Sequence, residues 1–350
     1  MSRKVIIDAD INNVLGAELP WEYFYGKTVV ITGANGFLPA YMLRTLYALN
    51  AQQPSAKIKI VAIVRNRDRF LKQFNDIPGI GEVELVIQDI SDPLRYEGPA
   101  DIIIHAASQA SPKFYGTDPV GTLAANTIGT YNLLKFAVSK KVSRFLYFSS
   151  SEVYGSVSNQ EAIAEQHYGT VDPLHVRSCY AESKRMGETM CISFSAQYSL
   201  PVVIVRPFHT YGPGLDLADG RVFSDFVSNV VHGKDIAINS DGSAVRSFCY
   251  LSDAAQAFFT VLLKGEPGNA YNVGNPVQSV SIRQLAKEVV SIYPEKGIRA
   301  NFAAPPATGY ISSAFNKLIP DISKLEALGW QPATTIREGF KRTIDSFISV

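Results

Sequence analysis

The chain has 350 residues, more than twice the length of a ~150-residue domain, so one or two compact lobes with a large core are expected. Lys and Arg total 33 against 32 Asp and Glu, a formal net charge of +1, and this balance gives no sign of a nucleic-acid-binding surface. A hydrophobic content of 46% excludes wholesale disorder.

The cysteines and the first 25 residues bear on the cellular compartment. Cys179, Cys191 and Cys249 are odd in number and show no C-x-x-C spacing, so neither a disulfide framework nor a metal cluster is predicted. Charged residues are mixed into the N-terminal segment, unlike a signal peptide, and no window approaches ~18 uninterrupted apolar residues. We therefore expect a cytoplasmic protein with no metal, no membrane contact and no nucleic-acid partner.

From residue 27 onward, short β-branched runs alternate with longer helical stretches, a pattern typical of βαβ units in a parallel sheet. The predicted strands are nearly all apolar, as strands buried on both faces are, and cover 28–32, 58–64, 83–87, 101–105, 144–149 and 201–206. The predicted helices between them cover 37–50, 66–75, 120–139 and 180–198.

After residue 207 the alternation changes. A Gly-rich stretch is followed by a predicted helix at 222–232, short strands near 236 and 246, and helices near 253, 282 and 335. The pattern predicts an α/β fold: a Rossmann-type doubly wound parallel sheet with a smaller C-terminal substrate-binding lobe. We assign 1–26 to an N-terminal extension, 27–207 to the dinucleotide-binding domain and 208–350 mainly to the second lobe, with the chain crossing between lobes.

The first strand leads into a glycine turn. Gly33 and Gly36 flank it and a helix begins near Phe37, an arrangement that lets backbone N–H groups approach a pyrophosphate. An ordinary strand-to-helix turn is the alternative, but the position in the first βα unit favours a dinucleotide site, to which Asn35 and Leu38 also belong. Pro39 stands where a third small residue is expected, which the first turn of a helix tolerates.

Basic residues follow the second strand, where an enzyme that uses NAD usually has an acidic residue for the ribose. Arg65 or Arg67 can hold a 2′-phosphate and so favour NADP, or can simply form a solvated edge. Asp89 and Ile90, after the third strand, are placed to line an adenine pocket; the alternative is a loop aspartate that begins a turn.

The most specific pattern joins two segments. Ser149, Ser150, Ser151 and Glu152 follow a central strand at the edge where such sheets bind ligands, and Tyr180-x-x-x-Lys184 places two side chains on one helix face. A tyrosine with its ordinary pKa of ~10 is a poor base, but a nearby ammonium and a nicotinamide cation favour the phenolate. A Tyr-x-x-x-Lys pair alone is common on surface helices. Here the glycine turn, the serine segment and the Tyr-x-x-x-Lys pair follow one another along the chain, and this combination points to catalysis.

The chain resembles extended short-chain dehydrogenases/reductases of the nucleotide-sugar epimerase/dehydratase superfamily, and among these it most resembles UDP-glucuronate decarboxylases. The similarity runs from Lys27 to Phe340. It is carried by TGANGF, HAASQASPKFYGTDPVGTLAANTIGTYNLL, SSSEVYG, VRSCYAESKRMGETMC, RPFHTYGP, DGRVFSDF and SAVRSFCYLSD.

The resemblance implies roles for individual residues. Tyr180 and Lys184 match the catalytic pair, Ser150 the family's Thr/Ser position, and Ser151 and Glu152 the decarboxylases' Ser-Glu. The implied cofactor wall further includes Ala106, Ala107, Ser108, Asn126, Ser149 and Pro207. The implied substrate-binding residues are Ser111, Arg177, His209, Arg221, Val222 and Arg246.

Several positions bear on which reaction is expected. Dehydratases of the dTDP-glucose type carry an aspartate at the position of Ser151, and the absence of this aspartate counts against that reaction. It does not decide the matter, because GDP-mannose dehydratases also have Ser-Glu there and often have arginines after the second strand. Simple 4-epimerases generally lack Glu152. Pro39, Arg65 and His209, which stands for the family's substrate-contacting asparagine, are departures from the pattern. His209 is either a pocket ligand or a packed histidine, and His105 is read as structural.

The resemblance implies an NAD-dependent enzyme, with NADP possible, that transiently oxidises carbon 4 of a nucleotide sugar. UDP-glucuronate decarboxylation is the leading expectation, and dehydration or epimerisation of another nucleotide sugar is the alternative. A catalytically silent dinucleotide-binding protein is the remote alternative. By analogy, helices near 120 and 185 are expected to form a homodimer contact.

Overall fold

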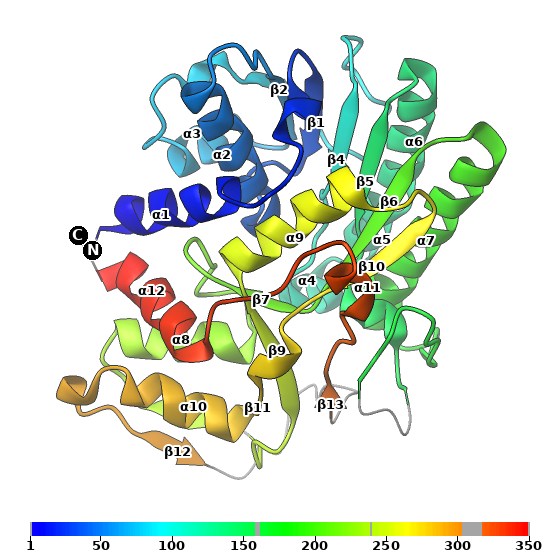
Figure 1. Cartoon of the computed structure of the whole chain (residues 1–350). Coiled ribbons are helices and arrows are strands. Elements are labelled where there is room, and N and C mark those ends of the chain that lie inside the picture. The colour runs from blue at the N-terminus through cyan, green and yellow to red at the C-terminus, as the bar shows by residue number, and fades with distance from the viewer. Residues whose placement is uncertain (1, 158–161, 239, 303–316, 349–350) are drawn as a thin grey trace.

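A computed structural model describes residues 2–157, 162–238, 240–302 and 317–348. A seven-stranded parallel sheet forms its centre, in the order β10-β6-β5-β4-β1-β2-β3 (Figure 1). The strands are β1 (Thr28–Thr32), β2 (Lys59–Val64), β3 (Glu84–Ile87), β4 (Ile102–His105), β5 (Arg144–Phe148), β6 (Val202–Pro207) and β10 (Asn269–Val273). This confirms the predicted fold class.

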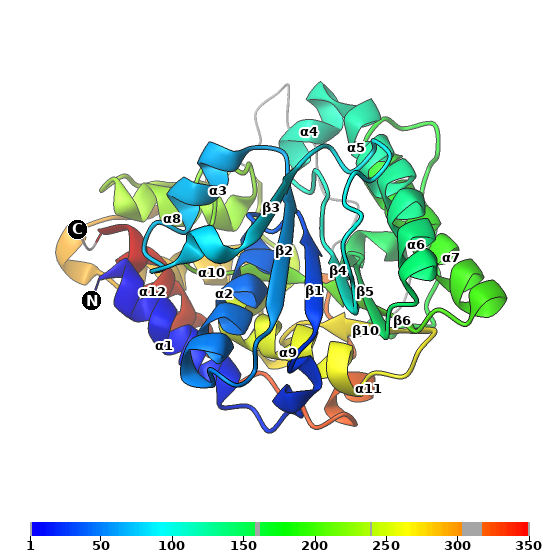
Figure 2. The ribbon, with the colours of Figure 1, turned by 90° about the horizontal axis from the view of Figure 1, so that it is seen from above.

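Helices cover both faces of the sheet. On one face lie α1 (Arg3–Leu15), α2 (Phe37–Gln52) and α9 (Leu251–Lys264), and on the other lie α5 (Pro119–Asn126), α6 (Ile128–Lys140) and α7 (Ser178–Tyr198) (Figure 2). α3 (Arg67–Gln73), α4 (Pro112–Thr117) and the short helix α11 (Ser323–Glu326) lie around the sheet.

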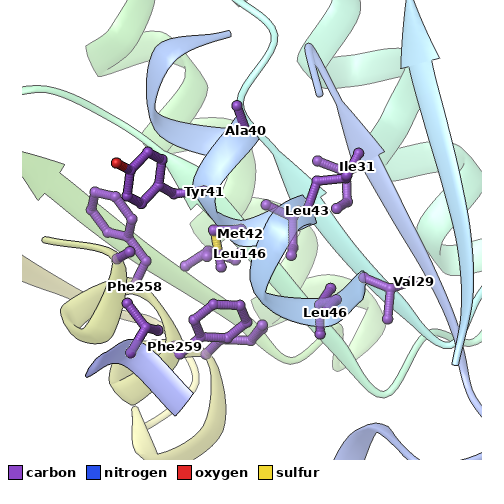
Figure 3. Close-up of a cluster of buried hydrophobic side chains, with 14 of the residues drawn as sticks. Val29, Ile31, Ala40, Tyr41, Met42, Leu43, Leu46, Leu146, Phe258 and Phe259 are labelled. Atoms are coloured by element: carbon purple, nitrogen blue, oxygen red, sulfur yellow. The ribbon is translucent and has the colours of Figure 1, made fainter. Parts of the chain in front are cut away.

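Side chains of α2 fill the space between β1 and α9. Leu43 and Leu46 pack toward Val29 and Ile31, and Phe258 lies on the opposite side of the same cluster (Figure 3). Burial of these apolar side chains contributes about 25 cal/mol per Å² removed from water. The packing fixes the position of α2, whose first residues lie at the ligand-binding edge of the sheet.

A smaller lobe is built from residues after β6. Its strands are β7 (His209–Tyr211), β8 (Ile236–Ile238), β9 (Val245–Tyr250), β11 (Ser279–Ser281), β12 (Ala300–Phe302) and β13 (Lys317–Leu318). Its helices are α8 (Val222–Val231), α10 (Ile282–Ser291) and α12 (Ile336–Ile348). They enclose a separate apolar core centred on Tyr211, Phe248 and Phe340. Five 3₁₀ turns complete the described elements: Trp21–Phe24, Ile80–Glu82, Ser151–Tyr154, Pro276–Gln278 and Pro294–Lys296.

The structure corrects four details of the predicted elements. The helix predicted at 120–139 is two helices that meet at Thr127, where φ is −109° and ψ is −66°, away from regular helix geometry, and where the side chain also bonds the Leu123 carbonyl. β3 is not buried on both faces, because it is the edge strand. The segment 269–273 adds a seventh strand beside β6, and α4 lies at 112–117, where no helix was predicted.

The described part of the N-terminal extension, residues 2–26, packs on the body of its own chain. Trp21 and Phe24 make ring contacts with Phe259 of α9, and the Tyr23 hydroxyl bonds Ser143. Among the described residues, no helix is both long and apolar enough to cross a membrane.

Candidate active site

The glycine turn between β1 and α2 brings two backbone segments close together and leaves the start of α2 uncapped by a side chain. Gly33 has φ +62°, and a Cβ there would lie 2.8 Å from the Ala107 Cα. Gly36 caps the 16-residue helix α2 without a side-chain hydrogen bond. The first N–H groups of a long helix are therefore left without a side-chain cap, at the edge where β1 and β4 end in register.

Three side chains meet at the end of β5. Ser150, just after β5, lies close enough to Tyr180 on α7 for its hydroxyl to lower the pKa of Tyr180, and both residues line the same cavity. The Lys184 amine, one turn further along α7, donates to the Phe148 carbonyl at 2.7 Å and lies 5.9 Å from the centre of the Tyr180 ring. Tyr180 and Lys184 are both buried. The structure thus brings the predicted Ser-Tyr-Lys set together.

Burial dominates the electrostatics of this set. Burial raises the pKa of Tyr180 to about 12, although its hydrogen bond with Ser150 and the charge of Arg221 act to lower it. Burial also lowers the pKa of Lys184 to about 7. In the polypeptide by itself both charged forms are disfavoured, because both groups are out of water; the predicted phenolate also depends on the nicotinamide cation, so it stays a prediction.

A cavity in front of Tyr180 is lined from both lobes. The larger lobe contributes the start of α2, Ala106, Ser108 and the run from Ser149 to Glu152, together with Lys184. The smaller lobe contributes His209, Arg221 and Phe223, and Pro207 lies between the two. A ligand in this cavity touches the sheet edge and the smaller lobe at once.

His209 is a half-buried, neutral ring within this cavity wall. Burial and the charges of Arg246 and Arg221 lower its pKa to about 3. Its Nδ1 has no hydrogen-bond partner among the described residues, and the rings of Phe223 and Phe248 flank it. The ring packs against two phenylalanines and also lines the cavity, so the interpretations of His209 as a packed histidine and as a pocket residue do not exclude each other.

Sequence reasoning missed Tyr115. Its ring stacks on that of Tyr180, with centroids 5.0 Å apart and an angle of 18° between planes. Its hydroxyl donates to the Ala110 carbonyl at 3.0 Å, and Arg221 donates to the same oxygen at 2.8 Å. The signal was available: Tyr115 lies in the quoted run HAASQASPKFYG, one helix turn after Ser111.

The other predicted substrate residues do not line this cavity themselves but lie next to residues that do. Arg177 lies 3.7 Å from the Glu152 carboxylate, in an ion pair one turn before Tyr180. The Ser111 hydroxyl donates to the Asp219 carbonyl at 2.9 Å, which joins the segment after β4 to the residues before α8. Arg246 is buried on β9, and Val222 begins α8.

The predicted adenine-side residues lie around the ends of β2 and β3. Arg65 is 61% exposed and 3.8 Å from Asp89. Burial opposes ionisation of Asp89, but hydrogen bonds from Ser91 and the charge of Arg65 hold its pKa below the ordinary value. Arg67 is the first residue of α3, and Ile90 is buried against Gly129 of α6.

The remaining predicted cofactor residues have structural partners. Asn126 donates to Ser183 at 3.0 Å, Ala107 donates its backbone N–H to Thr32 at 3.1 Å, and Ser149 donates to Glu188 at 2.5 Å. Asn35 and Leu38 lie in the glycine turn and the first turn of α2.

His105 is structural, as expected. Its two ring nitrogens bond the hydroxyls of Thr32 and Thr130, and burial lowers its pKa to about 3. Within the described ranges, no group of three or more His, Cys, Asp or Glu side chains is arranged to hold a metal ion.

Comparison with known proteins agrees with this geometry. The model of the NAD dependent epimerase/dehydratase family matches residues 29–274. UDP-glucuronic acid decarboxylase 6 of Arabidopsis thaliana is 34% identical over 326 residues, which cover 91% of this chain and 88% of that protein.

Solved structures share the fold. UDP-glucuronic acid 4-epimerase from Bacillus cereus, in complex with UDP-glucuronic acid and NAD, superposes with a TM-score of 0.76 at 22% identity, covering 91% of this chain and 98% of that one. The dTDP-glucose 4,6-dehydratase DesIV from Streptomyces venezuelae superposes with a TM-score of 0.76 at 23% identity, covering 91% and 96%. With a family model matched over 29–274 and a relative 34% identical over nearly its whole length, the chain belongs to the NAD dependent epimerase/dehydratase family.

Proposed function

We propose that this protein decarboxylates UDP-glucuronate, through a transient ketone at carbon 4 of the sugar. The observation that carries the proposal is that Ser150, Tyr180 and Lys184 line one cavity together with Gly36 of the glycine turn. Ser151, Glu152 and Arg221 line the same cavity. The 34% identical plant decarboxylase supports the choice of substrate.

The residues present fit a bound dinucleotide. Gly36 has no side chain at the start of α2, which leaves room for a pyrophosphate there. Gly33 lets the chain turn tightly against Ala107 just before this helix. When bound, the nicotinamide accepts a hydride from carbon 4 and later returns it, and its positive charge favours ionisation of a nearby phenol.

Tyr180 is the proposed base for the 4-hydroxyl. Its phenolate oxygen takes the hydroxyl proton as the C4–H bond breaks, while Ser150 donates a hydrogen bond to the same oxygen. Lys184 stays anchored on the Phe148 carbonyl, and its pKa of about 7 lets it release or accept a proton near neutral pH. Tyr115 holds the plane of the catalytic ring through stacking.

The ketone at carbon 4 makes the C6 carboxylate a β-keto acid. The C5–C6 bond breaks, its electron pair enters the C4–C5 enolate, and carbon dioxide leaves. Protonation of carbon 5 and hydride return at carbon 4 then give the UDP-pentose. We assign Ser151 and Arg246 to positioning the carboxylate, and Glu152, held by Arg177, to proton transfer at carbon 5.

The nucleotide and sugar are proposed to lie between the two lobes, against Arg221, His209 and Val222 of the smaller lobe and the segment of the larger lobe that Ser111 fixes. A second candidate reaction is 4,6-dehydration of another nucleotide sugar. The arginine at the end of β2 favours it, because the dehydratases that share Ser-Glu often carry one there.

For the cofactor, we propose NAD, with NADP as the alternative. Arg65 is exposed enough to meet a 2′-phosphate, but its partial pairing with Asp89 reduces the positive charge available. Titration of the purified protein with each dinucleotide distinguishes the two. Arg65→Ala should weaken NADP binding and leave NAD binding nearly unchanged, and the opposite ranking would reject a role for Arg65 in phosphate binding.

We also propose a cytoplasmic homodimer that buries the outer faces of α5 and α7. These helices pack side by side and expose Val120, Leu123, Met186 and Ile192 (Figure 2). Sedimentation of wild type and of Leu123→Glu tests the contact: the charge should shift a dimer to monomer, and a wild-type monomer would reject it.

Incubation with a panel of nucleotide sugars plus NAD, read by mass spectrometry, tests the proposed reaction. Loss of carbon dioxide from UDP-glucuronate is expected. Loss of water from a GDP- or dTDP-hexose, with UDP-glucuronate unchanged, would establish the dehydratase instead. Turnover of no sugar would reject both.

A further inference from the structure

The N-terminal helix α1 lies outside the family match and touches elements of both lobes. It packs against α2 and α9 of the larger lobe and against α12 of the smaller one. Figure 1 shows α1 lying beside α12, with the two chain ends close together. A helix in this position can fix the separation of the lobes.

One buried carboxylate on α1 joins the elements together. Asp10 is 1% exposed and accepts a hydrogen bond from Tyr41 of α2 at 2.9 Å and another from Tyr250, the last residue of β9, at 2.8 Å. Its second oxygen forms an ion pair with Arg342 of α12. Arg342 also donates to the Tyr250 hydroxyl at 3.2 Å.

The partners are distributed between the two lobes. Tyr41 belongs to the helix that begins at the dinucleotide turn. Tyr250 ends the strand that carries Arg246 and pairs with β7, where His209 lies opposite Phe248. Arg342 belongs to the helix that packs on α8, which starts one residue after Arg221. Each element is therefore linked to the cavity wall: α2 by its own first residues, β9 by its pairing with β7, and α12 by its packing on α8.

Burial makes the charge on Asp10 costly unless its partners remain in place. Burial raises its pKa to about 6, and the three donors offset only part of that effect. A group under this constraint holds its partners within a narrow geometry, because moving any of them leaves a buried charge without compensation.

We propose that Asp10 is a positioning residue: it clamps α2, β9 and α12 together, and so holds the nucleotide-sugar side of the cavity at the right distance from the dinucleotide side. The proposal rests on the proposed function for the identity of the ligand. Its specific consequence is that a ligand touching both lobes depends on Asp10, whereas a ligand held by the larger lobe alone does not.

The test compares two ligands in two variants of α1. Asp10→Asn keeps the volume of the side chain and removes its charge. Asp8→Asn is the matched control, because Asp8 is half exposed on the same helix and pairs only with Lys4 among the described residues. Binding of UDP and of NAD to each full-length protein is measured by calorimetry.

We expect Asp10→Asn to raise the Kd for UDP about tenfold, and to change that for NAD less than twofold, while Asp8→Asn changes neither. Tyr250→Phe, which removes a single hydroxyl, should weaken UDP binding in the same direction and gives the result if Asp10→Asn does not fold. Equal loss of both ligands, or no change in UDP binding, would overturn the proposal.

Failure of the clamp and failure of the proposed function are distinguishable. If wild type binds neither UDP nor a UDP-sugar, the proposed function is rejected. Hydrogen exchange of the ligand-free proteins then tests the clamp: Asp10→Asn should accelerate exchange in both α2 and β9, and unchanged exchange in either would reject it.

Discussion

Replacing Lys184, the buried lysine of the proposed catalytic set, tests the electrostatic account of the site. Lys184 is 3% exposed, and burial lowers its pKa from 10.5 to about 7. The unfolded chain therefore binds more protons than the folded chain between pH 7 and pH 10.5, so stability rises with pH across that window. The destabilisation by Lys184 is full below pH 7 and disappears above pH 10.5.

The magnitude follows from the same pKa values. Linkage predicts that the Lys184 contribution alone raises the free energy of unfolding by about 2 kcal/mol between pH 7 and pH 9. Lys184→Met removes this contribution. It also removes the hydrogen bond to the Phe148 carbonyl, worth about 1 kcal/mol, but that loss is the same at both pH values.

Urea denaturation of both proteins at pH 7 and pH 9 measures the effect. The difference between wild type and Lys184→Met isolates the lysine, because all other groups titrate in both. We expect wild type to gain about 2 kcal/mol more than the variant on going to pH 9. The exposed control Lys135→Met should behave as wild type. Equal gains in wild type and Lys184→Met would show that Lys184 titrates as if it were in solvent, and would refute the reasoning.

Two further substitutions test the glycine turn and the stacked tyrosine. Gly33→Ala puts a Cβ 2.8 Å from Ala107 at φ +62°, whereas the control Gly26→Ala has a similar φ of +69° and open space around the new Cβ. Denaturation should therefore show a larger loss of stability for Gly33→Ala than for Gly26→Ala. Calorimetry should show a loss of NAD binding for Gly33→Ala alone. Equal losses of stability would mean that backbone strain accounts for both. Tyr115→Leu should lower kcat/KM about tenfold by removing the ring stacked on Tyr180, whereas Tyr115→Phe, which keeps the ring, should stay within about threefold. Equal kinetics for Leu and Phe would show that stacking has no role.

Much of the larger lobe could be predicted, because its signals are local. A strand such as Thr28–Thr32 has an apolar centre and is buried along its whole length, and the glycine turn follows it directly. The serine segment and the Tyr-x-x-x-Lys spacing pointed to the set of Ser150, Tyr180 and Lys184 that the structure brings together, since the carboxyl ends of parallel strands meet at one edge.

The rest depends on tertiary contacts. Nothing local marks 269–273 as a partner of β6, and the break at Thr127 interrupts an otherwise continuous helical pattern. The pKa of Tyr180 reflects burial, which spacing does not report. The clamp of Asp10 joins residues up to 332 positions apart, so no short window of the sequence contains it.

The most direct measurement of transient oxidation uses UDP-glucuronate that carries deuterium at carbon 4, incubated with the enzyme and unlabelled NAD. The account predicts that wild type forms the UDP-pentose more slowly than from unlabelled substrate, with deuterium retained at carbon 4, and that Tyr180→Phe forms none while still binding NAD. Decarboxylation at an unchanged rate in the Tyr180→Phe variant, or a product whose carbon 4 has exchanged its deuterium for solvent hydrogen, would contradict it.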